Sequence, residues 1–344
     1  MIPPIRRWPI PRLLAAGEVG DRELLRRFRV DPPGIVREVA GRRLSALVSH
    51  RIPTIAPDLK PFLSRELGAV AQRRAALQTI DQLGVKALVF KGAANALSYY
   101  PSETLRSSQD LDILLHPADI EAMYPGELAQ DHQAHDHLPR KAFAGFATEV
   151  HYRIGTHSSW GSPEDIFADS IALADFANLR QPAPHIALTI ALLHMYKHYG
   201  RMPFDSIDIA MLRGIDWSAA ETLWIDRELL PLIMPGLLAY LRTSQTPPKI
   251  NLDRLWTKLS APESAWVELF AWHLLDQRFS FIREQRLRCH KHGYGFVEFC
   301  LRELLGSPEA TTQLTGYPVG DFRHRYYHYM GLPIRRVCRV FRSR

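Results

Sequence analysis

The sequence predicts an α+β fold, in which a small mixed sheet is flanked by helices and followed by a mainly helical C-terminal domain. Three short apolar segments predict strands, at residues 86–90, 111–115 and 147–154. Helical stretches separate them, so residues 62–155 alternate between helix and strand. From about residue 160 onward the apolar periodicity becomes helical.

The helices around this core follow from apolar spacing and from Pro and Gly punctuation. The amphipathic stretch 62–83 ends at Gly84, a helix opens at Gly92 directly after the first strand, and another begins at Ala118 after His116-Pro117. Further helical periodicity is found at residues 34–49, 185–199, 206–213, 218–241, 262–283 and 294–305.

Four regions are expected along the chain: a Pro/Arg-rich helical extension (1–60), an α/β core (61–160), a helical domain (161–310) and a basic tail (311–344). The formal net charge is +7, and seven arginines with no acidic residue lie between Arg323 and Arg344. The positive excess is therefore concentrated at this end. Such a tail could contact an anionic partner, although a solvated terminus is the ordinary alternative.

Composition limits the class of protein. Hydrophobic residues make up 46% and charged residues 23%, as in globular proteins. No uncharged apolar run reaches the roughly 18 residues of a membrane span, and no secretory signal is evident at the N-terminus. Three dispersed cysteines suit a reducing compartment, so we expect a cytoplasmic protein. The GxSxG, Walker A, GxGxxG and HExxH motifs are absent.

Two aspartates mark the second predicted strand. Because side chains alternate along a strand, Asp110 and Asp112 share one face while Leu111, Ile113 and Leu115 point into a core. Neighbouring carboxylates repel one another unless a cation lies between them, and Mg²⁺ prefers such oxygen ligands. The pattern indicates a metal site, although a charged, solvent-facing strand edge is the simpler alternative.

The third predicted strand places Glu149 and His151 on a shared face. If this strand lies beside the second, Glu149 completes a three-carboxylate cluster that can hold two metals. The alternative is an ion pair between Glu149 and Arg106 or Arg153.

Basic residues precede the aspartates. Lys91 and Gly92 lie at a strand-to-helix junction, where backbone N–H groups and a close approach favour phosphate. Arg106 is placed to clamp a triphosphate. Each of these residues, taken alone, is more often structural.

Together these motifs resemble the nucleotidyltransferase superfamily with a polymerase-β-like core, and most of all its uncharacterised nucleotidyltransferase-like families. The resemblance covers about residues 80–155 and includes the K-G pair, a helix ending in Tyr99 or Tyr100, the R-x-S-x-D-L-D segment and the Glu149 strand. The Gly-Ser or Gly-Gly signature of classical members is replaced by Lys91-Gly92-Ala93.

The resemblance implies transfer of a nucleoside monophosphate from an NTP, with ATP favoured, to an acceptor with release of pyrophosphate. Asp110, Asp112 and Glu149 would bind Mg²⁺ in a two-metal site, and Lys91, Gly92, Arg106 and Ser108 would contact the nucleotide. The acceptor could be a small molecule, a peptide or protein, or RNA. The alternative is a catalytically inactive nucleotide-sensing or nucleic-acid-binding protein with the same core.

A second group of candidate residues lies in the predicted helix 185–199. His194 and His198 are four residues apart and share a face, with Lys197 beside them. They could contact a base, an acceptor or a phosphate, and the resemblance includes such a helix followed by an aspartate, here Asp208. The ordinary alternative is a core histidine and a surface lysine.

Overall fold

The structure is a computed structural model that describes residues 5–124, 138, 140–152, 154, 162–198, 202, 204–244 and 250–275. The chain divides into two compact units, residues 1–278 and 279–344, and every described residue belongs to the first. The predicted boundaries at residues 60 and 160 therefore fall inside one unit. The predicted helix 294–305 and the basic tail 311–344 lie outside the described residues.

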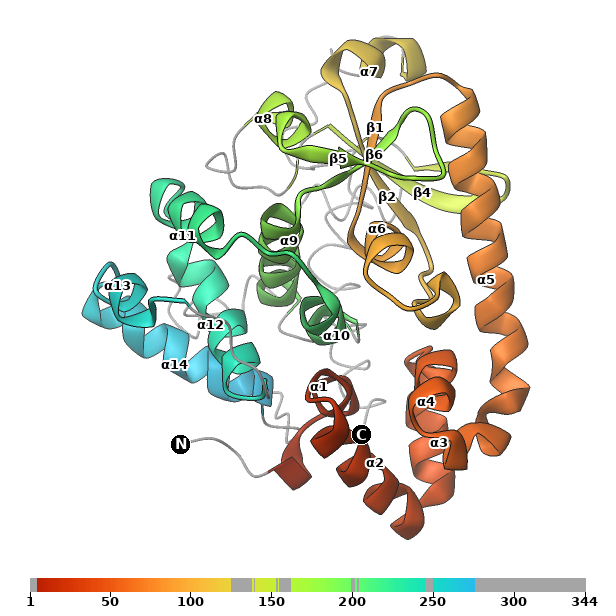
Figure 1. Cartoon of the computed structure of the whole chain (residues 1–344), viewed down its shortest axis with the longest axis vertical. Coiled ribbons are helices and arrows are strands. Elements are labelled where there is room, and N and C mark those ends of the chain that lie inside the picture. Colours follow the sequence, from red (N-terminus) through yellow and green to blue (C-terminus); the bar gives the residue numbers. More distant parts are fainter. Residues whose placement is uncertain are drawn as a thin grey trace, which may run out of the picture. The chain divides into compact units, whose positions relative to one another are not determined.

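A six-stranded mixed sheet forms the core, with the strand order β3-β4-β2-β1-β6-β5 (Figure 1). The strands are β1 (Ala87–Phe90), β2 (Leu111–Leu115), β3 (Lys141–Phe143), β4 (Phe146–His151), β5 (Ser170–Ala172) and β6 (Leu179–Pro182). Strand β2 pairs antiparallel with β1 and parallel with β4, while β1 runs parallel to β6. The pairs β3–β4 and β5–β6 are antiparallel. This arrangement confirms the predicted fold class, although β3, β5 and β6 had not been predicted.

Helices before the sheet form the N-terminal part of the unit. They are the 3₁₀ turn η1 (Ile5–Arg7), α1 (Ile10–Ala15), α2 (Glu18–Val30), α3 (Pro32–Gly41), α4 (Ser45–Arg51), η2 (Pro53–Ile55) and α5 (Ala56–Gln82). The predicted helix 34–49 is divided in two, because Arg43 adopts a left-handed backbone with φ 56°. The long helix α5 begins at Ala56, earlier than predicted, and includes Pro61.

The remaining helices surround the sheet and follow it. They are α6 (Lys91–Ser98), η3 (Glu103–Leu105), α7 (Pro117–Met123), α8 (Pro163–Ala168), α9 (Pro184–Lys197), α10 (Asp205–Met211), α11 (Trp217–Asp226), α12 (Leu230–Leu241), α13 (Leu252–Trp256) and α14 (Ala261–Leu275). The predicted single helix 218–241 is two helices, separated at Glu228, which has φ 54°. Among the described residues, no helix is both long and apolar enough to cross a membrane.

Two apolar clusters hold the unit together. In the first, Leu77 and Ile80 of α5 pack against Ile113 of β2 and Val150 of β4, which confirms the buried face predicted for β2. In the second, side chains of α1–α4 pack with Tyr100, Leu105 and Phe204, and with Ile207 of α10. The N-terminal helices therefore adjoin the segment that leads into β2.

One buried side chain of α5 positions that segment. The guanidinium of Arg73 is fully buried, and it donates hydrogen bonds to the backbone oxygens of Arg106 (2.6 Å) and Glu103 (3.2 Å). Burial lowers the pKa of Arg73 to about 10. Because buried carbonyl groups need donors, this contact fixes the loop that enters β2.

We predict that Arg73→Met lowers the free energy of unfolding by about 3 kcal/mol, since two carbonyls lose a charged donor. The neighbouring Arg74 is partly exposed and pairs with Asp175 at 2.7 Å, so Arg74→Met should cost less than about 1 kcal/mol. Urea unfolding of both variants measures the difference. Equal losses in the two variants would contradict a special role for Arg73.

Candidate active site

All the site residues predicted from the sequence line one cavity of about 490 Å³. Its walls come from the ends of β2 and β4, the start of α6, the loop before β2, and helices α9 and α10. The predicted residues that line it are Lys91, Gly92, Arg106, Ser108, Asp110, Asp112, Glu149, His151, His194, Lys197 and His198. Three stretches widely separated in sequence therefore meet at one place.

Parallel pairing of β2 with β4 creates the acidic wall. The register places Asp112 opposite Glu149, so the two side chains share a face, as predicted for adjacent strands. His151 lies on the same face, with Nε2 3.2 Å from Oδ1 of Asp112 and its ring edge-on to Phe90. Ligand atoms of Asp112, Glu149 and His151 lie within 4.8 Å of one another, so this group could hold a metal ion.

Asp110 lines the cavity but stands outside that three-residue group. Strand β2 begins only at Leu111, so Asp110 belongs to the preceding loop. Burial raises its pKa, and the negative charges of Asp112 and Glu149 raise it further. This repulsion shows that the three carboxylates interact electrostatically across the cavity.

Lys91 occupies a strained position at the strand-to-helix junction. It is a non-glycine residue with φ 54°, a conformation that costs roughly 1–2 kcal/mol. The strain places Nζ 2.6 Å from Oδ1 of Asp112. Burial alone would lower the pKa of Lys91, but Asp112, Glu149 and Asp110 outweigh it and raise that pKa. Burial would likewise raise the pKa of Asp112, yet Lys91 and His151 hold it well below its usual range.

Positively charged residues that the sequence did not point to also lie at the cavity. Arg140, just before β3, forms an ion pair with Glu149, where the sequence had suggested Arg106 or Arg153 as partners. Arg42 and Arg43, from the turn between α3 and α4, also line the cavity. The charge of Asp110 acts on Arg43, whose pKa is lowered mainly by burial. No local sequence signal marks these arginines, because their positions depend on the β3–β4 pairing and on a helix break.

The donor set fits a divalent cation. Asp112 and Glu149 supply the oxygen ligands that Mg²⁺ prefers, with Asp110 nearby. Asp112 contacts Lys91, and Glu149 contacts Arg140. The two carboxylates therefore lie where positive charge gathers, as a site for a divalent cation requires. The imidazole of His151 suits hydrogen bonding to Asp112 better than ligation of a hard cation.

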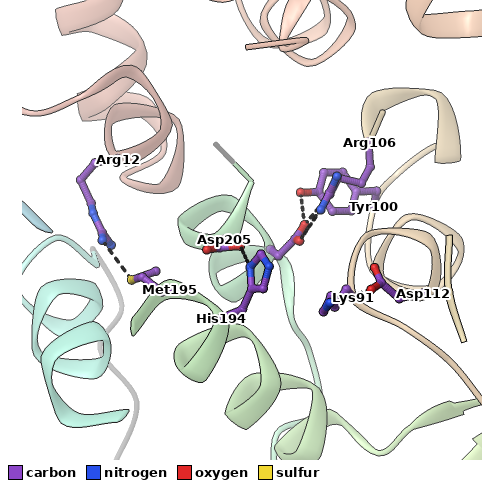
Figure 2. A network of polar contacts seen from close by, with 9 residues as sticks. Arg12, Lys91, Tyr100, Arg106, Asp112, His194, Met195 and Asp205 are labelled. Carbon is purple, nitrogen blue, oxygen red and sulfur yellow. Dashed lines mark hydrogen bonds and ion pairs between the residues drawn. The ribbon is translucent and has the colours of Figure 1, made fainter. Parts of the chain in front are cut away.

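Arg106 is bound to α10 rather than to the acidic wall (Figure 2). Its guanidinium forms a bidentate ion pair with Asp208, through Nε to Oδ1 (3.0 Å) and Nη2 to Oδ2 (2.9 Å). The hydroxyl of Tyr100 donates to Oδ1 of Asp208 at 2.7 Å. Burial would lower the pKa of Arg106, but Asp208 outweighs it and raises that pKa. The aspartate that the resemblance associated with this helical region is thus the partner of Arg106.

The guanidinium of Arg106, held in its ion pair with Asp208, leaves little room for a side chain at Gly92. A Cβ at this position would come within 2.7 Å of Nη2 of Arg106, so the guanidinium packs directly on the glycine. The phosphate role suggested for Gly92 from the sequence stays a prediction; in the structure the guanidinium of Arg106 lies against this glycine. Beside it, the buried hydroxyls of Ser107 and Ser108 have no hydrogen-bond partner among the described residues.

The opposite wall comes from one stripe of α9. Ala187, Ile190 and Ala191 line its apolar part, and His194 and His198 follow along the same face. The two imidazole centroids lie 4.4 Å apart. Burial and then the neighbouring His194 lower the pKa of His198 to about 4, so this ring is neutral at pH 7. The cavity thus has one wall with the carboxylates of β2 and β4. Its second wall, formed by α9, carries two histidines and then apolar side chains.

The fold and the cavity together define a nucleotidyltransferase-type core: a mixed sheet with paired carboxylates on neighbouring strands, facing basic side chains. The family model described as "Uncharacterised nucleotidyltransferase" matches residues 35–240, well over half of the chain, and the chain belongs to this family. This confirms the resemblance stated from the sequence. No curated protein and no solved structure matches the chain.

We predict that Lys91→Met lowers the free energy of unfolding by about 3 kcal/mol, because the buried carboxylate of Asp112 loses its lysine and keeps His151 as its partner. Adding Asp112→Asn to Lys91→Met should recover about half of the loss. Urea unfolding of the two single variants and the double variant gives the coupling energy. Additive losses would show that the ion pair does not couple the two residues.

Acid sensitivity should depend partly on His198. Its pKa of about 4 in the folded chain lies below the usual 6.5, so the unfolded chain binds more protons between these values. Stability from this group is complete above about pH 6.5 and is lost as the pH falls toward 4. His198→Gln should therefore reduce the loss of unfolding free energy between pH 7 and pH 5, measured in urea. His50→Gln, at an exposed position, is the control, and an unchanged pH dependence in His198→Gln would contradict the assignment.

Proposed function

We propose that the chain transfers a nucleoside monophosphate from Mg-NTP to a hydroxyl or phosphate acceptor and releases pyrophosphate. The observation that carries this proposal is the register of β2 and β4, which places Asp112 and Glu149 side by side on the wall of a cavity rich in cations. Family membership supports the reaction class. The acceptor could be a small molecule, a peptide or protein, or RNA.

Asp112 and Glu149 would hold Mg²⁺, with Asp110 as a further carboxylate on the same cavity. Bound Mg²⁺ would neutralise negative charge on the phosphates and so make the α-phosphorus a better electrophile. Asp110, Asp112 and Glu149 remain our candidates for a two-metal site, and ATP is the first nucleotide to test.

Lys91 and Arg140 have a natural second role. Both contact the carboxylates through the ends of long side chains, and both line the cavity. When the carboxylates serve as ligands, these cations are available to the triphosphate oxygens, where charge grows during transfer. The unpartnered hydroxyls of Ser107 and Ser108 can donate to phosphate or ribose oxygens. Arg106 we now assign to positioning, since Asp208 and the backbone oxygen of Ser107 take up three of its donors.

The apolar stripe of α9 suits the flat face of a nucleobase. Ala187, Ile190 and Ala191 offer a surface without polar groups, and Lys197 lies at the end of the helix that faces the cavity. A nucleotide spanning the two walls would place its phosphates by the carboxylates and its base on α9. This orientation explains why the cavity changes from charged to apolar along its length.

The experiment measures binding of Mg-ATP, Mg-CTP, Mg-GTP and Mg-UTP by calorimetry, together with pyrophosphate release. We expect Asp112→Asn and Glu149→Gln each to lower pyrophosphate release about 100-fold or more. Asp58→Asn, at an exposed site on α5, is the matched control and should stay within twofold.

Two outcomes would contradict the proposal in different ways. Nucleotide binding without pyrophosphate release, across a broad set of acceptors, would favour a nucleotide-sensing protein. Metal-dependent binding that survives the double change Asp112→Asn plus Glu149→Gln would show that the metal is held elsewhere.

A further inference from the structure

A second polar group, from α9 and α10, lines the same cavity as the carboxylates. Nδ1 of His194 lies 2.9 Å from Oδ1 of Asp205 (Figure 2). Asp205 is only 6% exposed, and its carboxylate accepts no other hydrogen bond from the described residues. An ionised carboxylate only accepts, so Nδ1 of His194 carries the proton. The lone pair of a neutral ring then lies on Nε2.

This arrangement leaves Nε2 of His194 available to accept a proton. His194 lines the cavity, and none of the described residues gives its Nε2 a hydrogen bond. The neighbouring ring of His198 is neutral, so it places no positive charge beside His194. A histidine whose Nδ1–H is held by a carboxylate is oriented to take a proton at Nε2.

A buried positive charge lies behind Asp205. Arg12 of α1 is 2% exposed and donates a hydrogen bond to Sδ of Met195 at 3.7 Å. Its Nε and Nη1 have no hydrogen-bond partner among the described residues, and Oδ2 of Asp205 has none either. Burial lowers the pKa of Arg12 to about 10, and attraction to Asp205 opposes that effect. Arg12 thus places a positive charge near the carboxylate that holds Nδ1 of His194.

The transfer reaction needs such a proton acceptor. A hydroxyl acceptor must lose its proton as its oxygen attacks phosphorus. Glu149, the alternative base, is paired with Arg140 and is also a candidate metal ligand, so its oxygens already have other partners. His194 has neither contact.

We propose that His194 is the general base for the acceptor hydroxyl, and that Asp205 is its positioning residue; the inference rests on the proposed nucleotidyltransferase function. The acceptor oxygen bonds to the α-phosphorus, the bond from that phosphorus to the bridging oxygen breaks, and pyrophosphate leaves. The hydroxyl proton passes to Nε2 of His194, and the imidazolium then releases it to solvent. The substrate class is therefore an alcohol or phenol rather than a group already deprotonated at neutral pH.

The first test separates binding from turnover in the full-length chain with Mg-ATP. His194→Ala and Asp205→Asn should bind Mg-ATP within about twofold of the original chain, while pyrophosphate release falls about 100-fold or more in His194→Ala and about 10-fold or more in Asp205→Asn. Added imidazole should restore part of the rate of His194→Ala and none of the rate of Asp112→Asn. His50→Gln, at an exposed position on α4, is the control and should lose less than threefold.

The second test is independent of turnover. In ¹⁵N NMR spectra, His194 should carry its proton on Nδ1, and Asp205→Asn should shift this tautomer toward Nε2–H. A wild-type ring protonated on Nε2, or a His194→Ala variant with undiminished release, would overturn this inference and leave the proposed function standing. No pyrophosphate release by the unmodified chain with any NTP, across a broad set of alcohol and phenol acceptors, would overturn both.

Discussion

The buried ion pair between Arg106 and Asp208 is the contact on which the two walls of the cavity depend. Arg106 enters from the loop before β2, and Asp208 belongs to α10, so the pair joins the sheet to the helices that follow it. Tyr100 binds the same carboxylate, Phe204 lies against the guanidinium at 3.9 Å, and Gly92 leaves room for it. Removing one partner from such a pair would leave a buried charge without its counter-ion, which is strongly destabilising. The pair therefore holds the loop before β2 and helix α10 in one relative position. A binding cavity needs this rigidity if its reacting groups are to meet.

The acidic wall is subject to a second constraint: the positive side chains around it must balance its negative charges. Carboxylates held close together raise one another's pKa. At Asp110 burial raises the pKa most, and the charges of Asp112 and Glu149 raise it further. Lys91 prevents this at Asp112, and Arg140 contacts Glu149. The backbone strain at Lys91 is the local cost of that arrangement. Under the proposed function, the same cations that balance the carboxylates would also stabilise the phosphates of a bound nucleotide.

Sequence patterns captured what is local and missed what depends on long-range pairing. The strand at 111–115 was predicted with the bounds found, and the face shared by Glu149 and His151 followed from strand alternation. The roles of Arg140 and Asp205 were not predictable, because each depends on contact with a residue of another element. The breaks at Arg43 and Glu228 escaped detection because neither is a glycine, the residue that usually marks a left-handed backbone. The role of Gly92 at a phosphate stays a prediction, and its contact with Arg106 could be found only in the structure.

The N-terminal helix α1 contributes a buried charged side chain to the region around α9. The family match begins at residue 35, so α1 and α2 lie outside it, yet Arg12 of α1 contacts Met195 and acts on Asp205. A fully buried arginine with unfilled donors costs free energy, and burial of apolar neighbours alone would be served better by leucine or methionine. Attraction to Asp205 opposes the effect of burial on the pKa of Arg12. A helix outside the family match therefore places a positive charge near the carboxylate that contacts His194.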